Sequence, residues 1–183
     1  MHDVDGLRWL VGDVVRVQAA TSSAVRGFPV EDTAAMVLTY ANGALGTFLL
    51  SDAAASPRSW EQTSGENANY ARHPDEDCYH LAGTAGSLSV PTMRLRSYPG
   101  ARSWEEPFQT STVEVPARDP LAVQVEHFAA VVRGEAEPVC SGRDGLATLQ
   151  VVDAVLESAA TGRPVDLPDP ATGRPRLEGS PPT

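Results

Sequence analysis

The sequence predicts an α+β fold: one large, mostly antiparallel or mixed sheet of about six strands, with helices packed on one face. Three observations predict it. Apolar and β-branched runs follow one another between residues 14 and 50, segments with helical spacing stand at both ends, and Asn42-Gly43 marks a tight hairpin between two of the runs. No GxGxxG or GxxxxGK[ST] motif occurs. We therefore expect no Rossmann domain in this chain.

The first elements follow directly from this pattern. Residues 2–11 place Val4, Leu7 and Val11 at helical spacing, and Gly12 stands where a helix ends. Strands are expected from Val14, Glu31 and Ala44, the last two joined by the Asn42-Gly43 hairpin.

The middle of the chain changes character. Residues 52–77 are rich in Ser, Pro, Asn, Glu and Asp, which predicts a long loop, with room for one short strand. Such loops in compact domains are usually either functional or disordered. Further strands are expected over 77–90 and 93–98, around a turn at Gly83 and Gly86, and over 111–116.

Two helices follow. Asp119-Pro120 is an N-cap with proline at the first helical position, and the helix presents one apolar face, made of Leu121, Val125, Phe128 and Val132. The second helix begins near Asp144, ends at Gly162, and is expected to point four residues inward, namely Leu146, Leu149, Val152 and Leu156. A short strand is expected at Val165. Residues 168–183, rich in proline and glycine, are expected to be a disordered tail.

Composition limits the partners. The chain has 183 residues, 42% of them hydrophobic, and a net charge of −10, which argues against nucleic acid and anionic membranes. It has no signal-peptide pattern and no apolar run near the roughly 18 residues of a membrane span, so we expect a soluble, cytoplasmic protein. Cys78 and Cys140 match neither a metal clip nor a disulfide framework, and His80 and His127 lack second ligands at zinc-like spacing. We expect no metal.

Four segments together resemble the C-terminal domain of the Gfo/Idh/MocA oxidoreductases, the family of glucose-fructose oxidoreductase and inositol dehydrogenase. They are HDVDGLRWLVG, VEDTAAMVLTYANGALGTF, HLAGTAGSLSV and SGRDGLATLQVVDAVLESAATGRPVDL. Each is ordinary alone, but their order and spacing are specific. The resemblance runs from His2 to about Leu167 and implies one substrate-side and oligomerisation domain over residues 1–167.

Family members also carry an N-terminal Rossmann domain with a glycine-rich dinucleotide site and an E-K-P lysine, none of which occurs in this sequence. The resemblance therefore implies NAD or NADP for a full-length parent that oxidises a sugar, polyol or related hydroxy compound. It implies no cofactor on this chain alone, which should be inactive. The alternative is a free-standing carbohydrate-binding or oligomerisation module without catalysis.

The family's catalytic D-x-x-x-H pair matches this sequence only at its histidine. His2 begins His2-Asp3-Val4-Asp5, and the aspartate four residues earlier would precede Met1. The resemblance implies that His2 takes the proton of a sugar hydroxyl while hydride leaves for nicotinamide, a task suited to a pKa near 6.5. In the isolated chain, a frayed terminus is the alternative. Asp5 either holds this helix against a neighbour or merely complements the helix dipole.

The loop offers the candidate substrate contacts. It pairs aromatic rings with amide, carboxylate and guanidinium groups, the chemistry of sugar sites, in Trp60, Glu66, Asn67, Tyr70 and Arg72. The alternative is a solvated loop at an oligomer contact. Glu31-Asp32-Thr33 resembles a framework pattern of the family. The open face of the sheet is expected to join a homo-oligomer through alternating residues such as Val37, Thr39, Phe48 and Leu50.

Overall fold

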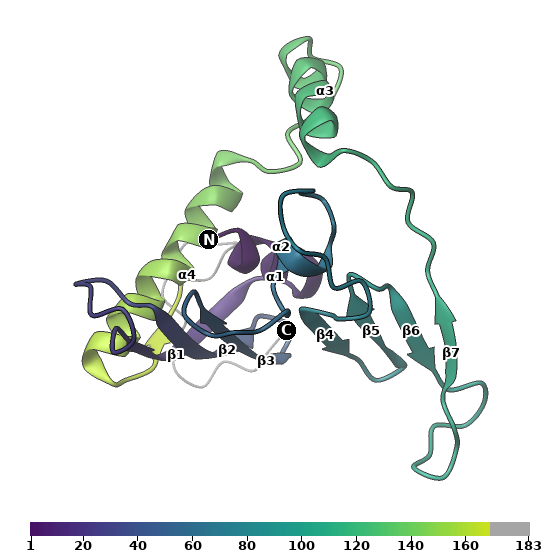
Figure 1. Cartoon of the computed structure of the whole chain (residues 1–183), viewed down its shortest axis with the longest axis horizontal. Coiled ribbons are helices and arrows are strands. Elements are labelled where there is room, and N and C mark those ends of the chain that lie inside the picture. Colours follow the sequence, from purple (N-terminus) through teal and green to yellow (C-terminus); the bar gives the residue numbers. More distant parts are fainter. Residues whose placement is uncertain (169–183) are drawn as a thin grey trace. The chain divides into compact units, whose positions relative to one another are not determined.

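A computed structural model describes residues 1–168, whose contacts divide the chain into two compact units (Figure 1). The first unit combines Met1–Ala54 with the described residues from Pro138 to 168, and the second is Ala55–Glu137. Each unit holds one four-stranded antiparallel sheet, which confirms the α+β class. The sequence predicted one sheet of about six strands. The described strands instead form two sheets, because β3 and β4 are not hydrogen-bonded to each other. The expected tail, apart from residue 168, lies outside the described residues.

The first unit has strand order β3-β2-β1-β8. Its elements are α1 (His2–Val11), β1 (Val14–Ser22), β2 (Thr33–Tyr40), β3 (Leu45–Ser51), α4 (Gly142–Thr161) and β8 (Val165–Asp166). The β2–β3 hairpin is confirmed: Gly43 has φ 85°, and the Asn42 side chain accepts from the Ala44 N–H at 3.0 Å and donates to the Val11 carbonyl at 2.8 Å. The hairpin tip is thus bonded to the end of α1.

The core of this unit lies between one face of the sheet and the helices α1 and α4. Val17, Leu38 and Val151 are almost fully buried there. Of the four residues of α4 expected to point inward, Val152 packs against the core, but the prediction is wrong for Leu146, Leu149 and Leu156, which are 57%, 44% and 46% exposed. The helix is rotated so that five other residues are buried, namely Thr148, Val151, Ala154, Val155 and Ser158.

Hydrogen bonds account for this rotation of α4. Ser158 Oγ accepts from the Ala19 N–H at 2.9 Å and donates to the Arg163 carbonyl at 2.7 Å, which ties the helix to β1 and to its own C-terminal turn. Apolar spacing alone fits either of two stripes on α4, and the hydroxyl bonds select the stripe that a hydropathy pattern disfavours.

The other face of the first sheet is open. Val37 and Thr39 lie on it as expected, but Phe48 pairs with Met36 and packs against the core, and Leu50 pairs with the buried Ala34. The expectation that Phe48 and Leu50 share a face with Val37 and Thr39 is therefore wrong, because the hairpin register places these two residues on the opposite face, where Leu50 is still 42% exposed. The outward residues of β3 are instead Leu45, Thr47 and Leu49.

The second unit has strand order β4-β5-β6-β7. Its elements are α2 (Trp60–Thr63), β4 (Tyr79–Ala82), β5 (Gly86–Val90), β6 (Arg94–Ser97), β7 (Gln109–Thr112) and α3 (Pro120–Val132). The long loop thus carries a short helix and no strand, and β7 begins before the expected segment.

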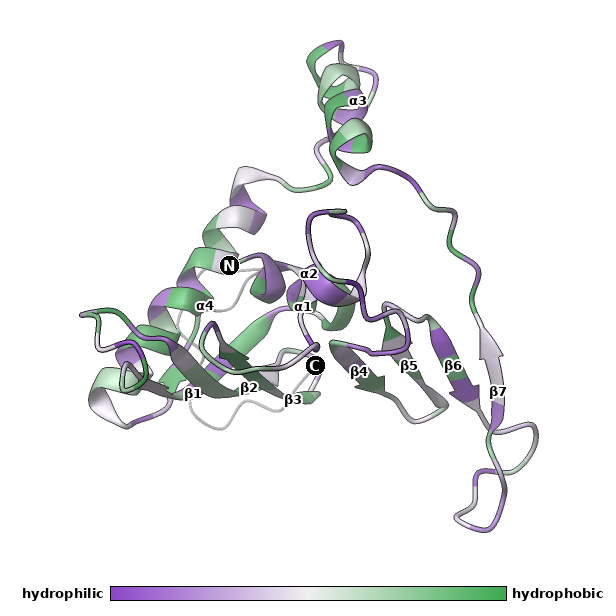
Figure 2. Ribbon diagram, in the orientation of Figure 1, coloured by the Kyte–Doolittle hydropathy of each residue, from purple (hydrophilic) through white to green (hydrophobic). Residues whose placement is uncertain are grey.

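The helix α3 begins as expected. Asp119 Oδ1 accepts from the Leu121 N–H at 2.9 Å, and Pro120 is the first helical residue. Apolar and polar residues are mixed along this helix (Figure 2). Its apolar stripe is 68–70% exposed, which differs from the expected packing on a sheet face; the stripe is Leu121, Val125, Phe128 and Val132. Among residues 1–168, no helix combines the length and apolarity that crossing a membrane requires.

Candidate functional site

His2 is the first residue of α1, which follows the N-cap Met1, and its side chain is exposed. The turn is closed by the Asp5 N–H, which donates to the Met1 carbonyl at 3.1 Å. His2 is thus helical in this structure and lies on the helix whose buried Val4 and partly buried Leu7 pack in the core. An exposed imidazole on a fixed helix can exchange protons with a bound hydroxyl compound.

Arg8 anchors that helix. Its side chain is only 9% exposed and donates to Asp13 Oδ1 at 2.6 Å, to Thr148 Oγ1 at 2.9 Å and to the Asp144 carbonyl at 3.0 Å. One guanidinium therefore joins α1, the turn after it and the first half of α4. The planar fork of arginine suits such a three-way contact better than the point charge of lysine would.

Asp5 completes the same network. Thr148 Oγ1 donates to Asp5 Oδ1 at 2.7 Å, and Arg8 lies 3.7 Å from that carboxylate. Of the two roles considered for Asp5, the structure thus shows the first: it holds the helix of His2 against a neighbour. The start of α4 is fixed as well, because Ser141 and Asp144 form a capping box, and the Ser141 bonds lower the pKa of the Asp144 carboxyl.

The loop of the second unit is organised around α2. Ser59 caps this helix, and Trp60 Nε1 donates to Glu66 Oε2 at 2.8 Å. The Trp60 ring lies 6.1 Å from the Tyr79 ring on β4, which attaches the loop to one face of the sheet. Gly65 has φ 73° and approaches the Arg72 side chain so closely that a Cβ would collide with it.

The two remaining loop candidates, Asn67 and Tyr70, differ in how far their side chains are available to a ligand. Asn67 Oδ1 accepts from the Asn69 N–H at 3.0 Å, and the Asn67 carbonyl accepts from the Tyr70 N–H, so the residue shapes the turn. Tyr70 is half exposed. The structure therefore brings Trp60, Glu66 and Arg72 together around Gly65, and leaves Tyr70 open to solvent.

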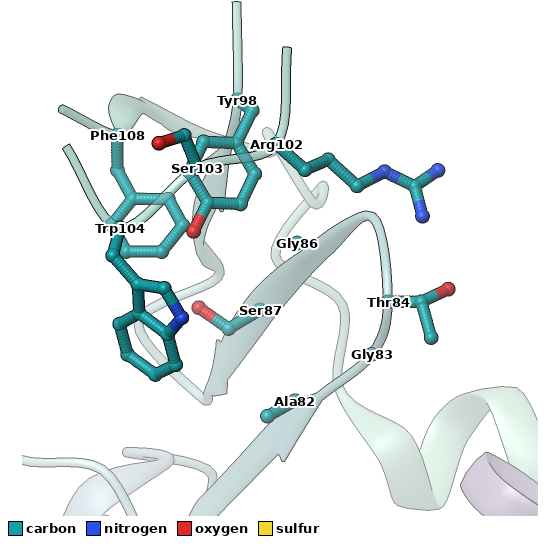
Figure 3. A pocket seen from close by; sticks show the side chains of 10 residues that line it. All are labelled: Ala82, Gly83, Thr84, Gly86, Ser87, Tyr98, Arg102, Ser103, Trp104 and Phe108. Carbon is teal, nitrogen blue, oxygen red and sulfur yellow. The ribbon is translucent and has the colours of Figure 1, made fainter. Parts of the chain in front are cut away.

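The sequence reasoning missed a cavity in the second unit. It has a volume of about 470 Å³ and lies between the turn Gly83–Gly86 and the segment 98–108 (Figure 3). Its lining includes Tyr98, Arg102, Trp104 and Phe108. The signal that the sequence offers is compositional, because this segment combines aromatic rings and arginine as the 60–72 loop does.

Neither unit offers a dinucleotide cradle. In residues 1–168 both sheets are antiparallel, and no glycine-rich turn leads from a parallel strand into a helix, which is how Rossmann domains hold the pyrophosphate. The described residues also contain no group of three His, Cys, Asp or Glu side chains placed to hold a metal ion.

The sequence of this chain is similar to those of known proteins. Residues 1–167 match the model of the oxidoreductase family C-terminal alpha/beta domain. The chain is 30% identical over 175 residues to D-apiose dehydrogenase of Paraburkholderia graminis, covering 91% of this chain and 43% of that protein. It is 28% identical over 173 residues to D-apiose dehydrogenase of Rhizobium rhizogenes, covering 91% and 47%. The chain thus spans less than half the length of these relatives.

A solved structure of levoglucosan dehydrogenase, in complex with NADH and levoglucosan, matches with a TM-score of 0.64 at 22% identity, covering 92% of this chain and 48% of that one. At this identity the match shows a shared fold. The family match over residues 1–167 shows that the chain belongs to the Gfo/Idh/MocA oxidoreductases, as a C-terminal α/β domain of that family.

Proposed function

We propose that residues 1–167 act as the substrate-side domain of an NAD- or NADP-dependent oxidoreductase for a sugar, polyol or related hydroxy compound. The curated relatives are named D-apiose dehydrogenases, and the levoglucosan dehydrogenase structure holds NADH and levoglucosan. The dinucleotide does not fit the residues described here. In this proposal a separate nucleotide-binding half supplies it, and this chain alone is inactive.

The observation that carries the proposal is the anchoring of the helix on which His2 stands. The residue matches the family's histidine and stands on a helix anchored by the buried Arg8 side chain. In its neutral form the imidazole accepts the proton of the substrate hydroxyl. Anchoring matters because general-base catalysis requires the base to stay within hydrogen-bond reach of that hydroxyl.

The loop around α2 is proposed to contact the substrate. Trp60 offers an aromatic face, while Glu66, Asn67, Tyr70 and Arg72 offer the acceptors and donors that hydroxyl groups require. The hydrogen bond from Trp60 to Glu66 orients both groups before a ligand arrives. Ordering the site in advance lowers the entropy cost of binding.

The open face of the first sheet is proposed to join two copies of the chain. Its apolar side chains are well exposed, with Val37 at 48%, Leu45 at 76% and Leu49 at 72%. Leu49→Glu is expected to shift the mass measured by light scattering toward a monomer. Val25→Glu, which changes an equally exposed residue outside the strands, is the matched control. An unchanged mass for Leu49→Glu contradicts this use of the face.

We propose a cytoplasmic location, because Cys78 and Cys140 form no disulfide, which is typical of a reducing compartment.

The dehydrogenase proposal itself is tested by titrating NADH into the purified chain and by assaying it with D-apiose and NAD⁺. Neither saturable binding nor turnover is expected. Tight dinucleotide binding by this chain alone overturns its assignment as the substrate-side half.

A further inference from the structure

One face of the second sheet is polar along all four strands. Because side chains alternate in a strand, the register places one set of residues on the same face: His80, Ala82, Ser87, Ser89, Arg94, Arg96, Thr110 and Thr112. The opposite face carries Tyr79, against whose ring the Trp60 ring packs. The polar face therefore points away from the loop that holds the proposed substrate contacts of this unit.

The 470 Å³ cavity continues this polar face at the edge near the β4–β5 turn, since it is lined by Ala82 and Ser87. Its volume falls within the range of roughly 300–1,000 Å³ that is usual for small-molecule sites. Gly86 lies in its floor, where any Cβ would collide with the Arg96 carbonyl oxygen. The close approach of these two strands fixes the floor of the cavity.

Aromatic rings form one wall. The Tyr98 and Phe108 rings pack at 4.6 Å between centroids, and Trp104 stands beside them, fully exposed (Figure 3). An indole held open to solvent contributes nothing to the packing of this unit. Flat aromatic surfaces of this kind bind ligands with an apolar ring face while hydroxyl groups bond elsewhere.

The charged side chain that lines the cavity is the guanidinium of Arg102, whereas Glu105 and Glu106 follow Trp104 in the chain without lining it. Arg102 lines the cavity and extends toward the side of the turn, while Arg94 and Arg96 lie on the same sheet face. In residues 1–168, none of these three guanidinium groups has a carboxylate within ion-pair distance. Guanidinium groups without protein partners suit a planar or tetrahedral anion.

We propose that this cavity binds a monosaccharide that carries one anionic group, either a carboxylate or a phosphate. The ring packs on Trp104, the hydroxyls bond to groups such as Ser87, and the anion pairs with Arg102. A neutral sugar would leave the guanidinium unpaired, and inorganic anions would leave the aromatic wall unused. The site needs no dinucleotide and goes beyond the proposed dehydrogenase function.

Calorimetric titration of the full chain tests this site with four probes: D-glucuronate, D-glucose 6-phosphate, D-glucose and inorganic phosphate. At least one of the two anionic sugars is expected to bind saturably, and at least about tenfold more tightly than glucose or phosphate, the difference due to a charged hydrogen bond. The tighter anionic sugar identifies the charged group. If neither binds, or if glucose or phosphate binds equally well, the proposal is wrong.

Two variants locate the site. Trp104→Ala is expected to weaken the anionic sugar about tenfold, and Arg102→Gln to remove its preference over glucose. The controls are Trp9→Ala, an exposed tryptophan of α1, and Arg58→Gln, an exposed arginine of the same unit. Both controls should keep full affinity. Unchanged binding in Trp104→Ala places any bound sugar elsewhere and overturns the proposal. Dehydrogenase activity in a complete enzyme is a separate readout, so either proposal can fail alone.

Discussion

Replacing Arg8 with alanine is expected to destabilise the first unit by about 3 kcal/mol. The side chain makes three hydrogen bonds as a charged donor, and each such bond contributes roughly 1.5–3 kcal/mol. The loss stays below the sum because the two acids left behind are partly hydrated, Asp5 being 43% and Asp13 37% exposed. Thr148 also keeps its bond to Asp5.

Urea denaturation gives the change in free energy of unfolding, and hydrogen exchange measured by mass spectrometry on residues 1–13 locates it. Faster exchange is expected in α1, where His2 begins the helix. Arg8→Lys should fall between wild type and Arg8→Ala, since one ammonium cannot replace three directed donors.

The matched control is Arg16→Ala. Arg16 also pairs with an acid, Asp166, but both side chains are 52% exposed, and exposed pairs contribute only about 0–1 kcal/mol. If Arg8→Ala costs less than about 1 kcal/mol, or no more than Arg16→Ala, then the buried hydrogen bonds of Arg8 do not hold α1 in place, and His2 does not stand on an anchored helix.

Three further predictions concern hydrogen bonds and a backbone turn that stabilise the first unit. Ser158→Ala should cost about 2–3 kcal/mol in urea denaturation, because the Ala19 N–H and the Arg163 carbonyl lose a buried partner; a neutral result would refute the account of the α4 rotation. Gly43→Val should cost about 1–2 kcal/mol at φ 85°, and an unaffected midpoint would contradict the strain. Hydrogen bonds from the Arg26 and Val25 N–H groups lower the pKa of Asp32, so its contribution to stability is complete above the unfolded pKa of about 3.9 and is lost as pH falls through the lower folded value. Asp32→Asn should flatten this part of the pH profile of unfolding.

Local chemistry was readable from the sequence. Asn42-Gly43 predicted the hairpin because few dipeptides accept its backbone angles, and Asp119-Pro120 predicted the start of α3 because a cap and a fixed φ coincide there. The family resemblance came from several such segments in a fixed order, and the match over residues 1–167 agrees with it.

Features set by distant contacts were not readable. Which face of α4 points inward depends on hydroxyl groups such as that of Ser158, which bonds to β1, far away in the sequence. The spacing of apolar residues does not reveal such bonds. The cavity depends on strand register, which brings Ser87 and Tyr98 to one face. The anchor of α1 joins Arg8 to Thr148, residues far apart in sequence whose pairing no local pattern reports.

The central claim is that this chain supplies the substrate side, including the base His2, to a sugar dehydrogenase whose other half binds the dinucleotide. The most direct test is the rate of NADH formation from D-apiose by a hybrid in which this chain replaces the matching C-terminal part of the Paraburkholderia graminis enzyme. The account predicts turnover by the hybrid and a loss of about 10²–10⁴-fold in His2→Ala, with NADH affinity retained. A folded, NADH-binding hybrid that is inactive, or one whose rate ignores His2→Ala, would contradict it.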